Sequence, residues 1–234
     1  MVAKLPGRGG GEGGTWVAIG AHYDHLGTGA PIRGDSIYNG ADDNASGVAA
    51  VLEAARLLAV APPARRGGRG TLFLWFTAEE SGLLGSAAFV ARPTVPLDSI
   101  VAFVNLDMIG RNSRGSVGVL GPRLSADVRR AVDAAGSRLP RPLEPDYTRD
   151  APGDTGRTFC RSDHLSFARA RIPVAFLSSG LHDDYHRPWD EASRLDYGKL
   201  ADVTLLAVHL VAELATRSAR PVLDPGVRPD ALCR

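Results

Sequence analysis

The chain has 234 residues, of which 44% are hydrophobic and 23% are charged, so it is long and apolar enough to bury a core. Its net charge is +1 and its arginines are scattered, which argues against the basic surface of a nucleic-acid-binding protein. No apolar run approaches the roughly 20 residues that cross a bilayer, and the first residues are too polar and glycine-rich for a signal peptide. Disorder, a membrane span and a nucleic-acid partner are therefore not predicted.

Short apolar runs alternate with helical repeats along the chain. In order, the sequence predicts a strand at 15–22, a helix over 48–58, a strand at 71–76, a helix from residue 83, strands at 100–106 and 117–120, a helix at 125–138, a strand at 173–179 and a helix at 197–216. Strands buried on both faces and separated by helices predict a three-layer α/β sandwich, in which helices flank a mostly parallel central sheet.

The two ends of the chain lack this pattern. The first 14 residues are predicted to be a loop or a ragged terminus, and residues 218–234 an irregular tail that wraps the surface or is disordered. Residues 1–217 are expected to form a single domain. Cys160 and Cys233 are far apart in the sequence, so two unrelated thiols are the favoured interpretation and a disulfide is the alternative.

Acidic and imidazole side chains follow most of the predicted core strands. In an open α/β sheet, ligands bind beyond the carboxyl ends of the strands, so these residues are expected at one edge. The five segments concerned contain His22, Asp24 and His25; Asp42 and Asp43; Glu79 and Glu80; Asp107; and residues 182–190.

Each segment also has an ordinary explanation when it is taken alone. A histidine after a strand is more often a loop residue, an aspartate before a helix is more often a cap, and paired glutamates in a first helical turn compensate the helix dipole. Asp107 is harder to explain in this way, because it interrupts an apolar run where a charge must be paired or bound to a metal. Five such segments at one edge predict a metal site.

The types of ligand narrow the choice of metal. Imidazoles with carboxylates and no thiolate suit zinc, with cobalt or manganese as substitutes, whereas calcium and magnesium favour oxygen ligands alone. One catalytic zinc needs only three protein ligands, so the surplus of carboxylates suits two metals that share a bridging carboxylate roughly 3.5–4 Å apart.

Six motifs carry a resemblance to a known family. They are GAHYDHLG (20–27), GDSIYNGADDNASG (34–47), FTAEESGLLGS (76–86), NLDMIG (105–110), RSDHLSF (161–167) and DDYHRPWD (183–190). In this order they resemble the zinc-dependent aminopeptidases with two co-catalytic zincs, which include secreted bacterial leucyl aminopeptidases. The resemblance covers residues 17–200. It implies a secreted or periplasmic enzyme that removes N-terminal residues from peptides with a free N-terminus. It also implies an N-terminal helix that is missing here or lies upstream.

The resemblance also assigns roles to residues of this sequence. It implies that Asp43 bridges two zinc ions, that Glu79 is the general base and that Asp24 orients a zinc-bound histidine. His25 receives no role and is interpreted as structural. The implied zinc ligands are His22, Asp43 and Asp107 at one ion, and Asp43, Glu80 and His186 at the other.

Several further residues keep two interpretations. Asp190 is either a hydrogen-bond partner behind His186 or a loop-capping carboxylate. Tyr185 is either a donor to the tetrahedral intermediate or an aromatic residue that packs the loop. Arg161 and Asp163 either lie near the substrate or form a surface ion pair. In the segment around Asp43, residues 44 and 46 are the candidates to cap the following helix, and Asp42 is expected only to hydrogen-bond locally.

Two other classes of function remain open. One is a different zinc enzyme on the same fold, either a single-zinc glutaminyl cyclase or a carboxypeptidase, which would need a basic pocket for which Arg161 is the candidate. The other is a non-catalytic binding relative, which would have lost ligands or the base. Metal stoichiometry separates the cyclase from the aminopeptidase, and the intact ligand set argues against the binding relative.

Overall fold

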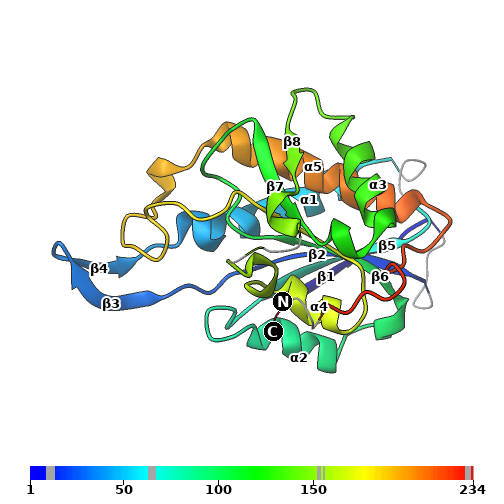
Figure 1. Ribbon diagram of the computed structural model, residues 1–234, viewed down its shortest axis with the longest axis horizontal. Helices are drawn as coiled ribbons and strands as arrows, with labels where there is room; N and C mark the ends of the chain where they lie inside the picture. The colour runs from blue at the N-terminus through cyan, green and yellow to red at the C-terminus, as the bar shows by residue number, and fades with distance from the viewer. Residues whose placement is uncertain (9–13, 63–66, 152–153, 155, 230–232, 234) are drawn as a thin grey trace.

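The computed structural model describes residues 1–8, 14–62, 67–151, 154, 156–229 and 233. At its centre is a seven-stranded sheet in the order β1-β5-β2-β6-β9-β7-β8 (Figure 1). Its strands are β1 (Val2–Leu5), β2 (Trp16–His22), β5 (Gly70–Phe76), β6 (Ile100–Leu106), β7 (Ser116–Leu120), β8 (Glu144–Asp146) and β9 (Val174–Ser178).

The middle of the sheet is parallel and its flanks are mixed. Strand β2 pairs in parallel with β5 and β6, and β6 pairs in parallel with β9. Strand β1 runs antiparallel to β5, and β7 runs antiparallel to β9. The four central strands therefore end at the same edge of the sheet, which brings the segments that follow them together.

Helices cover both faces of the sheet (Figure 1). On one face, α1 (Gly47–Val60), α3 (Ala126–Gly136) and α5 (Tyr197–Thr216) pack on a core of Val, Leu, Ile and Ala side chains. On the other, α2 (Leu84–Ala91) and α4 (His164–Arg169) cover a core rich in phenylalanine, in which the Phe103 and Phe167 rings stack 4.0 Å apart. The predicted α/β class with flanking helices is confirmed.

Three parts of the chain differ from the sequence prediction, of which the short strand β8 at the edge of the sheet is one. The first residues were expected to be a loop, but Val2–Leu5 form the edge strand β1, which extends the sheet by pairing with β5. Strands β3 (Gly27–Ile32) and β4 (Asp35–Tyr38) form an unpredicted hairpin that projects from the body (Figure 1). All three depend on strand pairing, which the apolar pattern of a short exposed segment does not reveal.

Where the structure describes it, at 218–229 and 233, the tail is irregular, as predicted, and it returns to the surface of the phenylalanine-rich core, here called the second core. Leu223 and Val227 pack against that core, and Val222 O accepts a 2.7 Å hydrogen bond from Ser125 Oγ. A disulfide joins Cys160 to Cys233. The interpretation as two unrelated thiols is therefore wrong, because the path of the tail brings together two sulfurs that are 73 residues apart in the sequence.

Across the described residues, the helices are too short or too polar to cross a membrane.

Candidate metal centre

Each predicted ligand lies at the carboxyl edge of the central strands. His22 is the last residue of β2, Asp107 directly follows β6, and Glu80 lies in the turn after β5. His186 lies on the segment after β9. Asp43 lies in the kinked turn Ala41–Ser46, directly before α1.

A first cluster, here called the buried group, consists of His22, Asp43 and Asp107. The Nε2 atom of His22 lies 3.3 Å from Asp43 Oδ1 and 3.4 Å from Asp107 Oδ1. Ser162 Oγ donates a 2.7 Å hydrogen bond to the other oxygen of Asp107. The side chain of His22 is only 1% exposed, so the polar atoms of this group are shielded from solvent.

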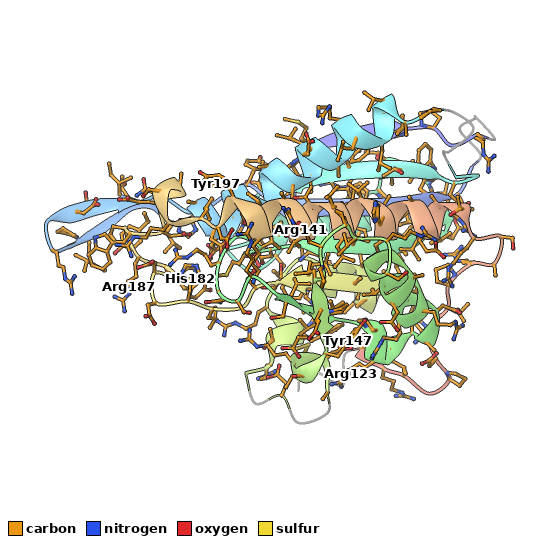
Figure 2. All side chains as sticks on the ribbon, turned by 90° about the horizontal axis from the view of Figure 1, so that it is seen from above. Arg123, Arg141, Tyr147, His182, Arg187 and Tyr197 are labelled. Carbon is orange, nitrogen blue, oxygen red and sulfur yellow. A yellow bond between two sulfur atoms is a disulfide. The ribbon has the colours of Figure 1, made fainter. Side chains whose placement is uncertain are left out.

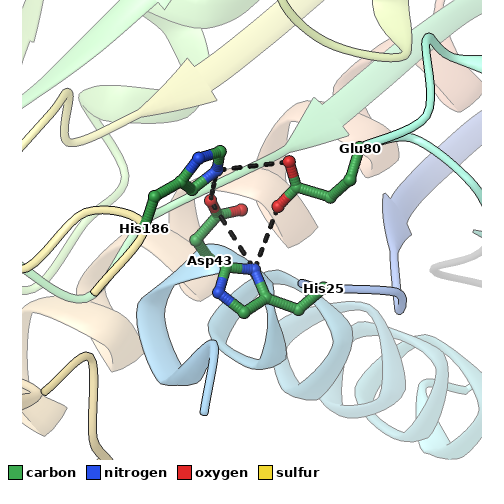
Figure 3. Close-up of side chains that lie close together, drawn as sticks. All are labelled: His25, Asp43, Glu80 and His186. Atoms are coloured by element: carbon green, nitrogen blue, oxygen red, sulfur yellow. Dashed lines mark hydrogen bonds and ion pairs between the residues drawn. The ribbon is translucent and has the colours of Figure 1, made fainter. Parts of the chain in front are cut away.

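A second cluster, here called the open group, consists of His25, Asp43, Glu80 and His186 (Figure 3). The Nε2 atom of His186 lies 3.2 Å from Asp43 Oδ2 and 3.2 Å from Glu80 Oε2. The second carboxylate oxygen of Glu80, Oε1, lies 2.9 Å from His25 Nδ1. The side chain of His186 is 32% exposed, so this group reaches solvent.

Asp43 belongs to both groups and turns a different oxygen to each. Its Oδ1 faces His22, whereas its Oδ2 faces His186, and the same Oδ2 is 3.9 Å from His25 Nδ1. The structure therefore brings together, around one shared carboxylate, the five residues to which the sequence assigned metal binding.

Backbone contacts hold Asp43 in this position. Asp190 accepts hydrogen bonds of 2.9–3.0 Å from the backbone N–H groups of Asp42 and Asp43, and it is fully buried. Gly40 has a φ of 66°, and a Cβ there would lie 2.6 Å from the oxygen of Asp43, so only glycine fits. The contacts of Asp190 match the loop-capping interpretation.

Of the two polar residues that were candidates to cap α1, one makes the capping hydrogen bond and the other does not. Asn44 Oδ1 accepts a 2.9 Å hydrogen bond from Gly47 N, as a cap does. Ser46 Oγ instead donates a 2.6 Å bond to Asp42 O, so its predicted capping role is wrong. The side-chain oxygen atoms of Asp42 meet Gly110 N at 2.6 Å and His182 Nε2 at 3.4 Å. Figure 2 shows His182 on the segment after β9.

Asp24 ties His22 to the turn that carries the two glutamates. Its carboxylate accepts hydrogen bonds from the backbone N–H groups of Glu79, at 3.1 Å, and Glu80, at 3.2 Å. Its Oδ1 lies 3.7 Å from His22 Nδ1, and its backbone oxygen is closer, at 3.1 Å. Asp24 can therefore orient the His22 ring mainly through its carbonyl while its carboxylate fixes the glutamate turn.

The charges of the centre shift the pKa values of its members strongly. Burial lowers the pKa of His186, but the carboxylates of Asp43 and Glu80 beside it raise that pKa to about 9. Burial also lowers the pKa of His22, but Asp107 raises it far above its usual range. Burial, with the Asp107 carboxylate, raises the pKa of Glu79 to about 9. Carboxylates and imidazoles crowded in this way favour a bound cation, which displaces the protons of the imidazoles.

The distances between the ligand atoms fit zinc. Atoms about 2.0–2.2 Å from a tetrahedral zinc ion lie roughly 3.3–3.6 Å from one another. The contacts that His22 and His186 make with their carboxylates measure 3.2–3.4 Å, which is longer than the usual N–H···O hydrogen bond of about 2.9–3.0 Å. His186 Nε2 is also buried without a hydrogen bond to any described residue. The donor set of imidazole nitrogen and carboxylate oxygen is the one zinc prefers.

His25 is the residue whose place in the centre the sequence did not predict. It was interpreted as structural, yet it lies within the open group, against Glu80. Its ring also contacts His186 edge to face, at 5.6 Å between centroids. The only available signal was its position three residues after His22, and that spacing gives no direction to a side chain outside a regular strand.

A pocket adjoins the centre, and two of the three predicted substrate contacts line it. Arg161 and Tyr185 line it together with Asp43, Glu79, Glu80 and Asp107. Tyr185 stacks on His186 at 3.8 Å, and burial, with the carboxylate of Asp43, raises the pKa of its phenol to about 12. The third, Asp163, is not among the described residues that line this pocket. It is fully buried, and burial raises its pKa to about 7, so the surface ion pair with Arg161 is not formed.

The fold and this centre define a class, namely α/β proteins with a cluster of metal-binding residues at the carboxyl edge of the sheet. Residues 1–211 match Peptidase family M28. The chain belongs to this family, and the resemblance seen in the six motifs is confirmed at that level.

Individual relatives agree with this assignment. A probable leucine aminopeptidase of Arthroderma benhamiae is 32% identical over 210 residues, which are 85% of this chain and 54% of that protein. The structure of an aminopeptidase from Aneurinibacillus sp. strain AM-1 is 26% identical, with a TM-score of 0.67 over 96% of this chain and 49% of that one. BSAP, a zinc aminopeptidase from Bacillus subtilis, shares the fold at 22% identity, with a TM-score of 0.72 over 97% of this chain and 51% of that one. This chain spans about half the length of the curated relatives it matches.

Proposed function

We propose that this chain acts as a two-zinc aminopeptidase that hydrolyses the first peptide bond of substrates with a free N-terminus. The observation that supports it best is the division of Asp43, whose Oδ1 faces the buried group and whose Oδ2 faces the open group. One carboxylate between two sets of ligand atoms is the arrangement that two-metal hydrolases use. Cobalt or manganese could replace zinc with the same donors.

The proposed zinc ligands fall into two sets that correspond to the buried and open groups. His22 and Asp107 would hold one ion and Glu80 and His186 the other, with Asp43 shared. His25 is proposed to orient Glu80, because its Nδ1 already meets Glu80 Oε1 at 2.9 Å. A hydrogen-bonded partner of this kind fixes the direction of a metal-binding carboxylate.

Glu79 is the proposed general base. It lines the pocket beside Asp107, and its backbone is fixed by Asp24. When bound, the zinc ions would supply an acidified water and an electrophile for the scissile carbonyl. Glu79, held as the carboxylate by their charge, takes the proton of the attacking water and passes it to the leaving amine.

Other residues of the pocket would position the substrate. The phenol of Tyr185, which burial and nearby carboxylates keep protonated, donates a hydrogen bond to the oxyanion. The carboxylates of the open group attract the positively charged α-amino group. This attraction restricts cleavage to the N-terminal residue of a peptide.

We also propose that the protein works outside the reducing cytoplasm. The disulfide between Cys160 and Cys233 supports this, because such bonds persist mainly in oxidising compartments.

Replacement of the base tests the proposal. Glu79→Gln should keep the zinc content of the wild type and lower kcat on leucyl p-nitroanilide by about 10²–10⁴-fold, since general-base catalysis contributes that much. Glu53→Gln is the control, because Glu53 lies on the exposed side of α1, away from the metal centre, and pairs with Arg56. Near-normal turnover in Glu79→Gln would reject the role of Glu79. One zinc per wild-type chain would instead favour the cyclase.

A further inference from the structure

The pocket beside the metal centre is lined by acidic, apolar and basic side chains. It measures about 270 Å³, and the acidic residues of the centre form one end. Met108, Phe176 and Leu181 supply apolar surface, and Arg149 and Arg161 contribute two guanidinium groups. A substrate held at the metal centre would therefore share this pocket with both apolar and cationic side chains.

These two arginines differ from Arg111 and Arg194 in forming no ion pair with a carboxylate of the described residues. Arg111 and Arg194 both form ion pairs with Asp184, at 2.7 Å and 3.1 Å. Within the described part of the chain, no ion pair joins Arg149 or Arg161 to a carboxylate. Unlike Arg111 and Arg194, the two arginines that line the pocket are therefore not held by an ion pair of this kind.

The backbone on which each arginine stands is anchored. Arg149 precedes the buried Asp150, whose carboxylate accepts hydrogen bonds from Gly121 N at 2.7 Å and Arg123 N at 2.6 Å. Arg161 lies between Cys160, which is fixed by the disulfide, and Ser162, which hydrogen-bonds Asp107. Such preorganisation lowers the entropy lost when a ligand binds.

The guanidinium of Arg149 lies over Gly180, on the segment after β9. A Cβ at position 180 would come within 2.1 Å of Arg149 Nη1, so the missing side chain leaves room for the cation at the pocket. Arg161 is near enough to Tyr185 to lower the pKa of its phenol, against the effect of burial. The two cations thus lie on segments that meet at this pocket.

One carboxylate lines the pocket outside the metal centre, and it is already engaged. Asp154 accepts hydrogen bonds from Gly156 N at 3.1 Å and from Thr158 N at 2.6 Å. Two guanidinium groups against this single carboxylate leave the lining outside the metal centre with a net positive charge. An anionic group of the substrate would complement it.

We propose that this pocket recognises a carboxylate of the substrate through Arg149 and Arg161. The inference rests on the proposed function and adds a substrate class to it, namely short peptides with a carboxylate near the cleaved bond. That carboxylate has two sources, the side chain of an N-terminal glutamate or aspartate, or the C-terminus of a dipeptide. Planar guanidinium groups bind either one bidentately.

Matched neutral substrates separate the two sources. Glutamyl p-nitroanilide against glutaminyl p-nitroanilide tests the side chain, and Leu-Gly against Leu-Gly amide tests the C-terminus. We expect the zinc-loaded wild type to show a higher kcat/KM for the charged member of one pair. In the Arg149→Met/Arg161→Met double variant that preference should fall about ten-fold or more, as expected for the loss of hydrogen bonds to a charged group.

A control and a second readout make the result specific. Arg92→Met, at an exposed arginine after α2, should keep both wild-type preferences. Calorimetry gives a readout independent of turnover, in which free glutamate should bind the wild type more tightly than glutamine and the double variant should lose the difference. Equal preferences in the wild type and the double variant for both substrate pairs would overturn the inference.

Failure of this inference is distinguishable from failure of the proposed function. If the wild type releases leucine from leucyl p-nitroanilide in a chelator-sensitive reaction but shows no preference for either charged substrate, the aminopeptidase stands and the carboxylate site is rejected. If none of the substrates is cleaved and free glutamate binds no better than glutamine, both are rejected.

Discussion

The two groups that share Asp43 differ mainly in how far they are shielded from solvent. The side chain of His22 in the buried group is 1% exposed, whereas that of His186 in the open group is 32% exposed. The buried group is also supported by a hydrogen bond, which Ser162 donates to Asp107. The open group is bounded instead by Tyr185, which stacks on His186 and lines the pocket.

This difference suggests unequal tasks for two otherwise similar sets of donors. A shielded and braced set holds an ion tightly, because its ligands are already in place and water is excluded. A partly exposed set on a loop exchanges its ion more easily and lies where a substrate can reach it. Substitutions in the two groups should either remove this asymmetry or measure it.

The largest effect is expected from the residue that the two groups share. Asp43→Ala removes an oxygen from each, so zinc content should fall from about two ions per chain to below one, and activity should fall by about 10³-fold or more. Elemental analysis of dialysed protein and turnover of leucyl p-nitroanilide measure the two effects.

A control for Asp43→Ala is available at a distance. Asp35→Ala, in the β3–β4 hairpin, removes only a 2.9 Å hydrogen bond to Ile37 N and should keep both ions. Two ions retained in Asp43→Ala would show that Asp43 is not shared.

A paired substitution measures the asymmetry itself. His22→Ala and His186→Ala each remove one imidazole, but the first leaves Asp107 buried without its partner and the second opens a site that is already exposed. We expect His22→Ala to lower the free energy of unfolding by about 3 kcal/mol, because Asp107 keeps its bond from Ser162 but loses the imidazole of a buried pair, and His186→Ala by less than about 1 kcal/mol.

Zinc release gives the second measurement for this pair. In the wild type, dialysis against a weak chelator should remove one ion before the other, and His186→Ala should lack the ion that leaves first. Simultaneous loss of both ions from the wild type would contradict the comparison.

Removing the hydrogen bond that supports the buried group should have a smaller effect on stability and zinc binding. Ser162 donates to Asp107 Oδ2 at 2.7 Å and accepts from Asn105 Nδ2 at 2.8 Å. Ser162→Ala leaves both partners buried and unsatisfied, which should cost about 1–3 kcal/mol of stability. Zinc affinity of the buried group should fall about 10–100-fold. Calorimetry of zinc binding and urea unfolding measure these effects, with Ser193→Ala at an exposed site as the control.

Much of the core could be predicted from the sequence, for a physical reason. Strands buried on both faces are continuous apolar runs, and the predicted strand at 100–106 and helix at 197–216 coincide with β6 and α5. The convergence of His22, Asp43 and Asp107 was also predictable, because parallel strands deliver the residues after them to one edge.

What the sequence did not reveal depends on contacts between distant segments. Strand β1 exists because β5 offers an unpaired edge, and the disulfide forms because the tail returns to the second core. His25 has no distinctive neighbour in the sequence and reaches Glu80 only through the fold. Arg149 lies outside every motif, so its place beside Arg161 follows from the folded loops alone.

The smallest effect concerns a histidine whose environment is opposite to that of the open group. His164 is fully buried between Phe176, whose ring stacks on it at 4.3 Å, and Phe159, at 4.8 Å. Burial lowers its pKa to about 3, whereas carboxylates raise that of His186 to about 9. Below its unfolded-state pKa of about 6.5, His164 takes up a proton on unfolding that the native state does not bind.

His164 should therefore make the free energy of unfolding fall as pH decreases from about 6.5 towards 3, and contribute no pH dependence above about 6.5. His164→Leu keeps an apolar side chain between the two rings and removes this proton. Urea unfolding of both proteins at about pH 5 and about pH 7.5 gives the difference, in which the protons of the metal ligands cancel because both proteins keep those ligands. We expect the wild type to lose more stability between these pH values than His164→Leu does. An equal loss in the two proteins would mean that the imidazole is already protonated in the native state, and that burial between two aromatic rings does not dominate its pKa.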